Sequence, residues 1–193
     1  MELILLTPSN YVTTSWAGGA TTQLAISPEG ALYADRDFLW RVSSATVELD
    51  ESDFTPLPDY RRFISTLSGE MKLSHNGGAE LTLCPGEVHA FDGADVTHSR
   101  GRCTDFNLML RKGSAEGSMS ALRPGGNAVF SADESTDEAI IYCASGSGCT
   151  SLGARSVRFS AGEALLLKDA AGTSLKLDCA EDTFLMAVQM RRL

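Results

Sequence analysis

Polar side chains that could hold a small anion alternate with apolar ones along two segments of the chain. Arg41 and Ser43 are two residues apart, and Asp105, Asn107 and Arg111 keep the same even spacing. In a strand, residues two apart point to one face. A guanidinium clamps a carboxylate through two parallel hydrogen bonds, while hydroxyl and amide groups set its orientation. The residue types therefore predict a site for a small acidic ligand.

The residues between these polar positions are apolar and need a core. Phe106, Leu108 and Leu110 form the other side of the second segment, so the polar side must face solvent or a water-filled lumen. A lumen would suit a small acid, with Arg62 as a further clamp and Asp105 holding an arginine in place. The alternative is that these arginines and the aspartate form surface ion pairs, each worth about 0 to 1 kcal/mol, and that no binding site exists.

Three histidines, His75, His89 and His98, offer a different chemistry. If residues 91–96 close a four-residue hairpin loop, His89 lies opposite His98, and two imidazoles with a carboxylate could hold a divalent metal. The H-x-H pair that usually begins such a site is absent. An ordinary cross-strand pair is the simpler interpretation, so we expect no metal and no cofactor, with His89 and His98 as the alternative.

Other reactions lack the residues that they need. The sequence has no G-x-S-x-G elbow, no phosphate-binding glycine loop and no cysteine with a convincing histidine partner. Five cysteines form an odd set without a C-x-x-C pair, which is typical of small apolar residues packed in a sheet. We therefore expect a binding protein rather than an enzyme.

The charge of the chain excludes two classes of partner. It has 25 acidic and 16 basic residues, a formal net charge of -9, and its lysines and arginines are scattered. Nucleic acid and anionic membranes are therefore not expected to bind. The apolar stretch near the start, residues 3–6, is too short for a signal peptide or a membrane span, which predicts a cytoplasmic protein.

Short apolar or alternating runs bounded by Gly, Pro, Asn and Asp predict an all-β fold. No window sustains the 3.6-residue period of a helix. An exposed edge strand in such a fold would favour a homodimer. The expected strands are residues 2–6, 21–27, 38–49, 62–67, 80–84, 103–111, 139–144, 164–168 and 183–190.

A faint repeat divides the chain into two halves. Residues 67–69 correspond to 144–146, residues 83–87 to 159–163, and residues 108–109 to 185–186, all at an offset of 76 or 77. The segment between the halves is rich in Gly and Ser and predicts a linker. We expect an N-terminal half at 1–112, a linker at 113–127, and a C-terminal half at 128–193 completed by strands from the N-terminal segment. The strand order in each half resembles the cupin jelly roll.

Three blocks of residues extend this resemblance to one family. Residues 40–45 fit W-R-x-S-x-A, residues 58–62 fit P-x-x-x-R, and residues 105–111 fit D-x-N-x-M-x-R. Together, over roughly residues 16–113, they are similar to the HutD/Ves family. The match departs at residues 16–23, where the family's W-K-N-G-G-G-x-T and acidic residue are replaced by W-A-G-G-A-T-T-Q.

The resemblance implies a bicupin fold and a setting around bacterial histidine utilisation. It also implies a regulator that binds an acidic catabolite such as N-formylglutamate or urocanate. Trp16, beside Gly18-Gly19, would be a pocket wall or lid. The alternative is a metal-dependent cupin enzyme, an isomerase or a dioxygenase. The expected ligand-binding residues are Trp16, Thr22, Arg41, Ser43, Arg62, Asp105, Asn107, Met109 and Arg111.

Overall fold

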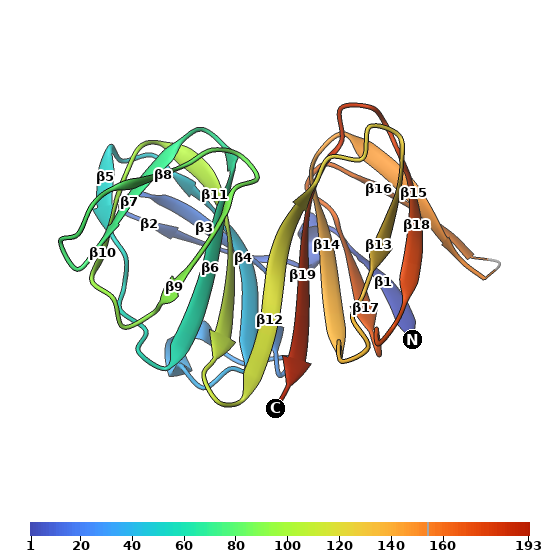
Figure 1. The fold of residues 1–193 in the computed structure, drawn as a ribbon, viewed down its shortest axis with the longest axis horizontal. Coiled ribbons are helices and arrows are strands. Elements are labelled where there is room, and N and C mark those ends of the chain that lie inside the picture. Colours follow the sequence, from blue (N-terminus) through green and yellow to red (C-terminus); the bar gives the residue numbers. More distant parts are fainter. Residues whose placement is uncertain (154) are drawn as a thin grey trace. The chain divides into compact units, whose positions relative to one another are not determined.

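The computed structural model describes residues 1–153 and 155–193 and is built almost entirely of antiparallel strands (Figure 1). The chain divides into two compact units. The N-terminal unit contains Tyr11–Glu116 and Leu193, and the C-terminal unit contains Gly117–Arg192 with Met1–Asn10. The predicted all-β fold is confirmed. In the described part of the chain, no helix has the length and apolar character needed to span a membrane.

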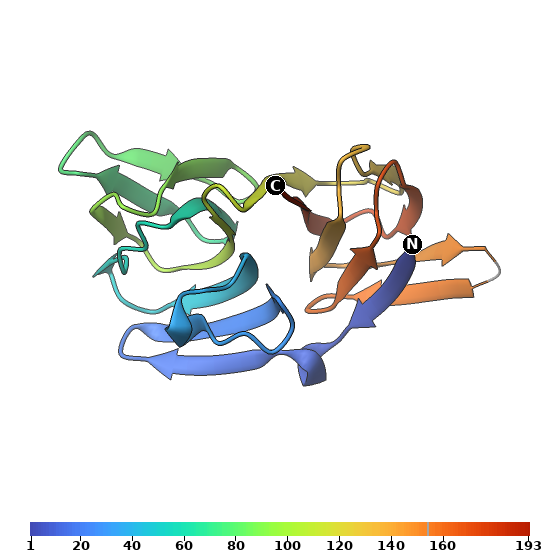
Figure 2. The same cartoon turned by 90° about the horizontal axis from the view of Figure 1, so that it is seen from below.

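The N-terminal unit is formed by two sheets. The six-stranded sheet has the order β2-β3-β4-β11-β6-β9, and the four-stranded sheet has the order β5-β10-β7-β8. Figure 2 shows the β2–β3 hairpin, in dark blue, along one side of this unit. The strands of the larger sheet are β2 (Val12–Trp16), β3 (Gly19–Ser27), β4 (Trp40–Val47), β6 (Tyr60–Ser68), β9 (Val88–Asp92) and β11 (Cys103–Arg111). Those of the smaller sheet are β5 (Glu51–Asp53), β7 (Met71–His75), β8 (Leu81–Leu83) and β10 (Thr97–Arg100).

The C-terminal unit repeats this arrangement with sheets of five and four strands, in the orders β1-β17-β14-β19-β12 and β13-β18-β15-β16. The larger sheet contains β1 (Glu2–Leu6), β12 (Ala115–Leu122), β14 (Glu138–Ser145), β17 (Ala164–Lys168) and β19 (Phe184–Arg192). The smaller sheet contains β13 (Asn127–Ser131), β15 (Ser147–Leu152), β16 (Arg155–Ser160) and β18 (Ser174–Cys179). Two short 3-10 turns, Pro8–Asn10 and Tyr33–Asp35, complete the secondary structure.

The repeat seen in the sequence corresponds to equivalent turns in the two units. Gly69, after β6, and Gly146, after β14, both have a left-handed backbone, with φ of 75° and 80°. In the corner that follows, the Glu87 carboxylate accepts the Cys84 N–H at 2.8 Å, and Glu163 accepts the Ser160 N–H at the same distance. The matching blocks thus mark the same structural positions in each unit.

The segment 113–127 is more than the linker that its composition predicted, because strand β12 lies within it. Ala115 and Met119 are buried on this strand. A Cβ on Gly117 would lie only 2.2 Å from the Gln189 carbonyl of β19. The small residues therefore permit close strand packing, and they were misinterpreted as signs of a flexible connection.

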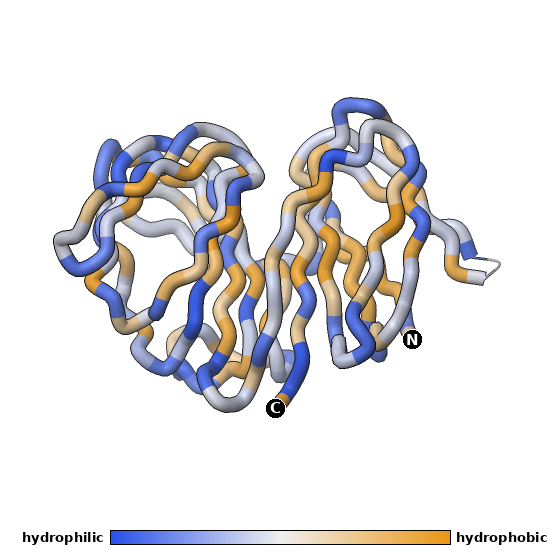
Figure 3. Tube along the Cα trace, viewed as in Figure 1, coloured by the Kyte–Doolittle hydropathy of each residue, from blue (hydrophilic) through white to orange (hydrophobic). Residues whose placement is uncertain are grey.

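Each unit has an apolar core between its two sheets. In the N-terminal unit, one core cluster joins Val47, Ile64 and Cys103 of the larger sheet to Met71 and Leu73 of the smaller one. The C-terminal unit has a larger cluster, formed by aliphatic and aromatic residues of both its sheets. Figure 3 shows hydrophobic residues along the strands and many hydrophilic ones at the turns.

Candidate functional site

A polar cluster lies on the inner face of the six-stranded sheet of the N-terminal unit. Met109 on β11 pairs with Arg41 on β4 and with Arg62 on β6, so the three side chains form one row. Asn107 pairs with Ser43 in the next row. By strand alternation these positions face the same way as the core residues that contact the smaller sheet. The polar cluster consists of Arg41, Ser43, Arg62, Thr66, Asp105 and Asn107, all of them buried.

Arg41 is held at the β3 side of the cluster. Its Nε donates to the Gln23 side-chain oxygen at 2.7 Å, and its Nη1 donates to the Ser43 hydroxyl at 3.3 Å. The guanidinium lies 4.3 Å from the centre of the Tyr33 ring, a cation–π contact. Burial lowers the pKa of Arg41 from its ordinary value. Its position and orientation are therefore well defined before any ligand arrives.

Arg62 lies between two aromatic rings on the opposite side of the cluster. Its guanidinium carbon is 4.9 Å from the Phe54 ring centre and 5.1 Å from that of Phe91, and Nη1 donates to the Thr55 carbonyl at 3.4 Å. Burial lowers its pKa to about 10. Among the described residues, neither Arg62 nor Arg41 has a carboxylate within ion-pair distance.

Asp105 orients an amide rather than an arginine. Its Oδ1 accepts the Ala45 N–H at 3.0 Å and the Asn107 Nδ2 at 2.6 Å. Burial raises its pKa to about 7, against the opposing effect of these hydrogen bonds and of the Arg62 charge. The expectation that Asp105 would hold an arginine in place is therefore replaced by a role in positioning Asn107.

Three polar atoms of the cluster are buried without a hydrogen-bond partner. They are Arg62 Nε, Thr66 Oγ1 and Asn107 Oδ1. In the part of the chain that the structure describes, no other buried side-chain nitrogen or oxygen lacks a partner. An unpaired buried polar group costs about 1 to 3 kcal/mol. Their concentration in one place indicates a site prepared for a partner.

Thr22 does not belong to this cluster. It pairs with Ser44 on the opposite face of the sheet, and its hydroxyl is 3.0 Å from that of Thr13. The next residue, Gln23, pairs with Ser43 and takes the inward position. One sequence signal could have identified Gln23 as a residue of the site: it occupies the position of the acidic residue in the family pattern.

Trp16 is also remote from the polar cluster and does not form its wall or lid. Trp16 is 41% exposed at the end of β2, and its ring packs on Gly18 and Leu49. Its pairing partner Gly19 faces Val47. Val47 is six residues along β4 from Arg41, or about 20 Å of strand.

Met109 and Arg111 make contacts that stabilise the surroundings of the site. Met109 packs against Phe38, Leu57 and Tyr60 in an apolar cluster. Arg111 donates through Nε to the Phe38 carbonyl at 3.0 Å and through Nη2 to the Tyr60 hydroxyl at 2.9 Å and the Arg36 carbonyl. It therefore anchors the segment that carries Tyr33 rather than clamping a ligand.

The predicted pairing of His89 with His98 is wrong. The chain between them passes from the six-stranded to the four-stranded sheet, so the hairpin does not form. His89 instead has its Nε2 2.9 Å from that of His75, and its pKa is lowered by burial and by His75. His98 lies 2.8 Å from Asp53 on the other face. Among the described residues, no group of three or more His, Cys, Asp or Glu is suited to a metal.

Sequence analysis did not place any of four aromatic residues beside the cluster, although it named His75. Tyr33 reaches Arg41 from a 3-10 turn, and no periodic pattern marks such a residue. Phe54 lies just after β5, whereas Phe91 and His75 lie on inward strand positions. Strand alternation could have found the last two, because His75 follows Met71 and Leu73 at two-residue intervals.

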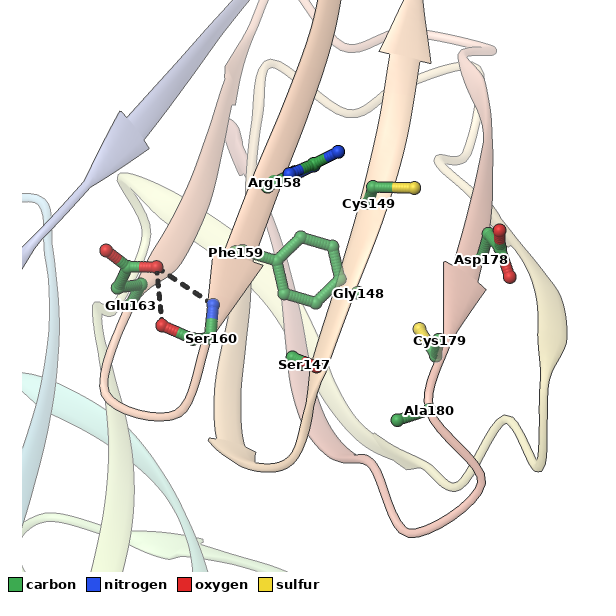
Figure 4. Close-up of a pocket in the computed structure, with 10 residues that line it drawn as sticks. All are labelled: Ser147, Gly148, Cys149, Arg158, Phe159, Ser160, Glu163, Asp178, Cys179 and Ala180. Carbon is green, nitrogen blue, oxygen red and sulfur yellow. Dashed lines mark hydrogen bonds between the residues drawn. The ribbon is translucent and has the colours of Figure 1, made fainter.

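A pocket of about 510 Å³ lies in the C-terminal unit (Figure 4). It offers Arg158 on one strand, but also the carboxylates of Glu163 and Asp178. Glu163 is engaged by the Ser160 N–H at 2.8 Å and the Ser160 hydroxyl at 3.0 Å. Two carboxylates against one guanidinium make this pocket unsuitable for an acidic ligand, so the polar cluster is the candidate site.

Two-sheet jelly-roll units, one of which directs polar residues between its sheets, place this chain among the cupins. The family is shown by sequence. The sequence model described as HutD matches residues 8–186, and the chain belongs to the HutD family. No curated protein matches it.

Solved structures agree on the fold. A conserved protein of unknown function, PA5104 from Pseudomonas aeruginosa PAO1, is 24% identical with a TM-score of 0.86, covering 99% of this chain and 100% of that one. HutD from Pseudomonas fluorescens SBW25, in a formate condition, is 18% identical with a TM-score of 0.80 and full coverage of both chains. YhhW from Escherichia coli is 12% identical with a TM-score of 0.67, covering 97% of each chain.

Proposed function

We propose that this HutD-family protein binds a small acidic metabolite at the polar cluster and acts as a cytoplasmic regulator linked to histidine utilisation. N-formylglutamate and urocanate are the candidate ligands. The carboxylate would lie near Arg62 and Arg41, with Ser43 and Asn107 setting its orientation. Tyr33, Phe54 and Phe91 would supply apolar walls around the acid.

One observation carries this proposal: two buried guanidinium groups without an ion-pair partner among the described residues. Burying a charge is costly unless an opposite charge and hydrogen bonds compensate for it. Burial lowers the pKa of both Arg41 and Arg62, yet at about 10 the latter is still protonated at neutral pH. A bound carboxylate would supply the missing negative charge and a partner for Arg62 Nε.

Replacing Arg62 with Ala tests the proposal directly. Loss of a charge-assisted hydrogen bond costs about 1.5 to 3 kcal/mol, so affinity for the acid should fall at least roughly 10-fold. Because Arg62 is a buried cation without an ion pair, the melting temperature should stay the same or rise. Calorimetric titration with N-formylglutamate, urocanate and glutamate, alongside thermal unfolding, measures both effects.

Arg158→Ala is the matched control, because it removes an exposed arginine of the C-terminal unit. It should leave affinity unchanged. If Arg62→Ala bound all three acids as tightly as the wild type, or if none bound to the wild type, the proposed site would be wrong.

A further inference from the structure

The amide of Asn107 has a defined orientation inside the site. Its Nδ2 donates to Asp105 Oδ1 at 2.6 Å, while its Oδ1 has no partner. Asn107 is only 7% exposed. An amide oxygen is an acceptor only. The site therefore displays a buried hydrogen-bond acceptor next to its two guanidinium groups.

The opposite orientation of this amide is disfavoured by the backbone. Asp105 Oδ1 already accepts the Ala45 N–H at 3.0 Å, so this oxygen serves as an acceptor. Turning the amide would place Asn107 Oδ1 against it, which brings two acceptors together at hydrogen-bond distance. A proton on the other oxygen of Asp105 would not change this. Asp105 is thus a positioning residue for Asn107, both when it is ionised and when its other oxygen carries the proton.

We infer that the ligand carries an N–H or O–H donor for Asn107 Oδ1 in addition to the acidic group that faces Arg62. This inference rests on the proposed function and narrows it to a class: small carboxylic acids that also bear an N–H or O–H hydrogen outside the carboxylate. An acid without such a hydrogen would leave Asn107 Oδ1 unpaired. Leaving a buried acceptor unsatisfied costs more binding free energy than a satisfied hydrogen bond contributes.

Two probes of the same size separate this requirement from simple anion binding. The first is N-formylglutamate, and the second is its ester isostere, in which oxygen replaces the N–H. Wild-type protein should bind the amide at least about 10-fold more tightly than the ester by calorimetric titration. Asn107→Leu should lower the affinity for the amide to that for the ester and leave the affinity for the ester nearly unchanged.

One further variant acts as a control. Asn127→Leu makes the same change at an exposed position of β13 and should keep the preference for the amide. Asn107→Ser replaces Asn107→Leu if the latter does not fold, and its shorter side chain should lose the preference too.

The possible outcomes distinguish the inference from the function on which it rests. Equal affinity of wild type for both probes would overturn the donor requirement while leaving an acid-binding site. A preference that survives in Asn107→Leu would show that Asn107 is not the acceptor. If neither probe bound at all, the inference and the proposed function would both be lost.

Discussion

At the scale of single residues, alternation in the sequence located much of the polar cluster. Arg41 and Ser43 share one face of β4 and Asp105 and Asn107 share one face of β11 as predicted, because the side-chain period of a strand is two. That this face points inward was one of the two alternatives that the sequence left open. What alternation could not predict was the partner of each group. Asp105 holds the Asn107 amide instead of a guanidinium, and this choice depends on strand register.

The ionisation of Asp105 predicts a pH dependence of stability. Its pKa in the fold is about 7, above the ordinary 3.8, so the folded state binds the proton more tightly than the unfolded chain does. The contribution of Asp105 to the free energy of unfolding is complete below pH 3.8 and is lost as the pH rises through 7. Between pH 5 and 8 this loss is about 3 kcal/mol.

Asp105→Asn removes this titration and retains an acceptor for the Ala45 N–H. Subtracting its unfolding free energies from those of the wild type at each pH isolates the Asp105 contribution. The subtraction is needed because the pKa of His89 is lowered in the fold, so its own contribution is lost as the pH falls. Identical pH profiles for the two proteins in urea unfolding would contradict the shifted pKa of Asp105.

At the scale of elements, strands with continuous or alternating apolar residues were found at their true positions, including β1 at Glu2–Leu6, β11 at Cys103–Arg111 and β17 at Ala164–Lys168. Elements defined by long-range geometry were missed. The inward position of Gln23 depends on the register in which β3 pairs with β4, and the partner of His89 depends on the chain crossing between sheets. Neither feature has a local signal in the sequence.

Strand β12 is the clearest case, and it supports a prediction. Gly117→Val should lower the unfolding free energy by about 1 to 3 kcal/mol, because a Cβ there would lie 2.2 Å from the Gln189 carbonyl and force β12 away from β19. Ser118→Val, at an exposed neighbouring position of the same strand, is the control. Equal stability of the two variants in urea unfolding would indicate that the strands can separate without cost.

At the scale of the whole molecule, the two units have similar strand orders, with larger sheets of six and five strands, but differ in what fills the space between their sheets. The N-terminal unit carries the polar cluster, whereas the main core cluster of the C-terminal unit is apolar. The chain also crosses over: β1, from the start of the sequence, pairs with β17 and adds Leu3 to the C-terminal core. Stability and ligand binding should therefore respond to different mutations.

Leu3→Ala separates these two properties. Leu3 is 2% exposed, and truncating a buried leucine costs about 2 to 5 kcal/mol, so the melting temperature should fall clearly. Affinity for the acid should stay the same at temperatures where the variant is folded, because every residue of the polar cluster is in the N-terminal unit. Val129→Ala, at an exposed position of the C-terminal unit, should change neither property. A folded Leu3→Ala variant with weakened binding would mean that the C-terminal unit contributes to the site.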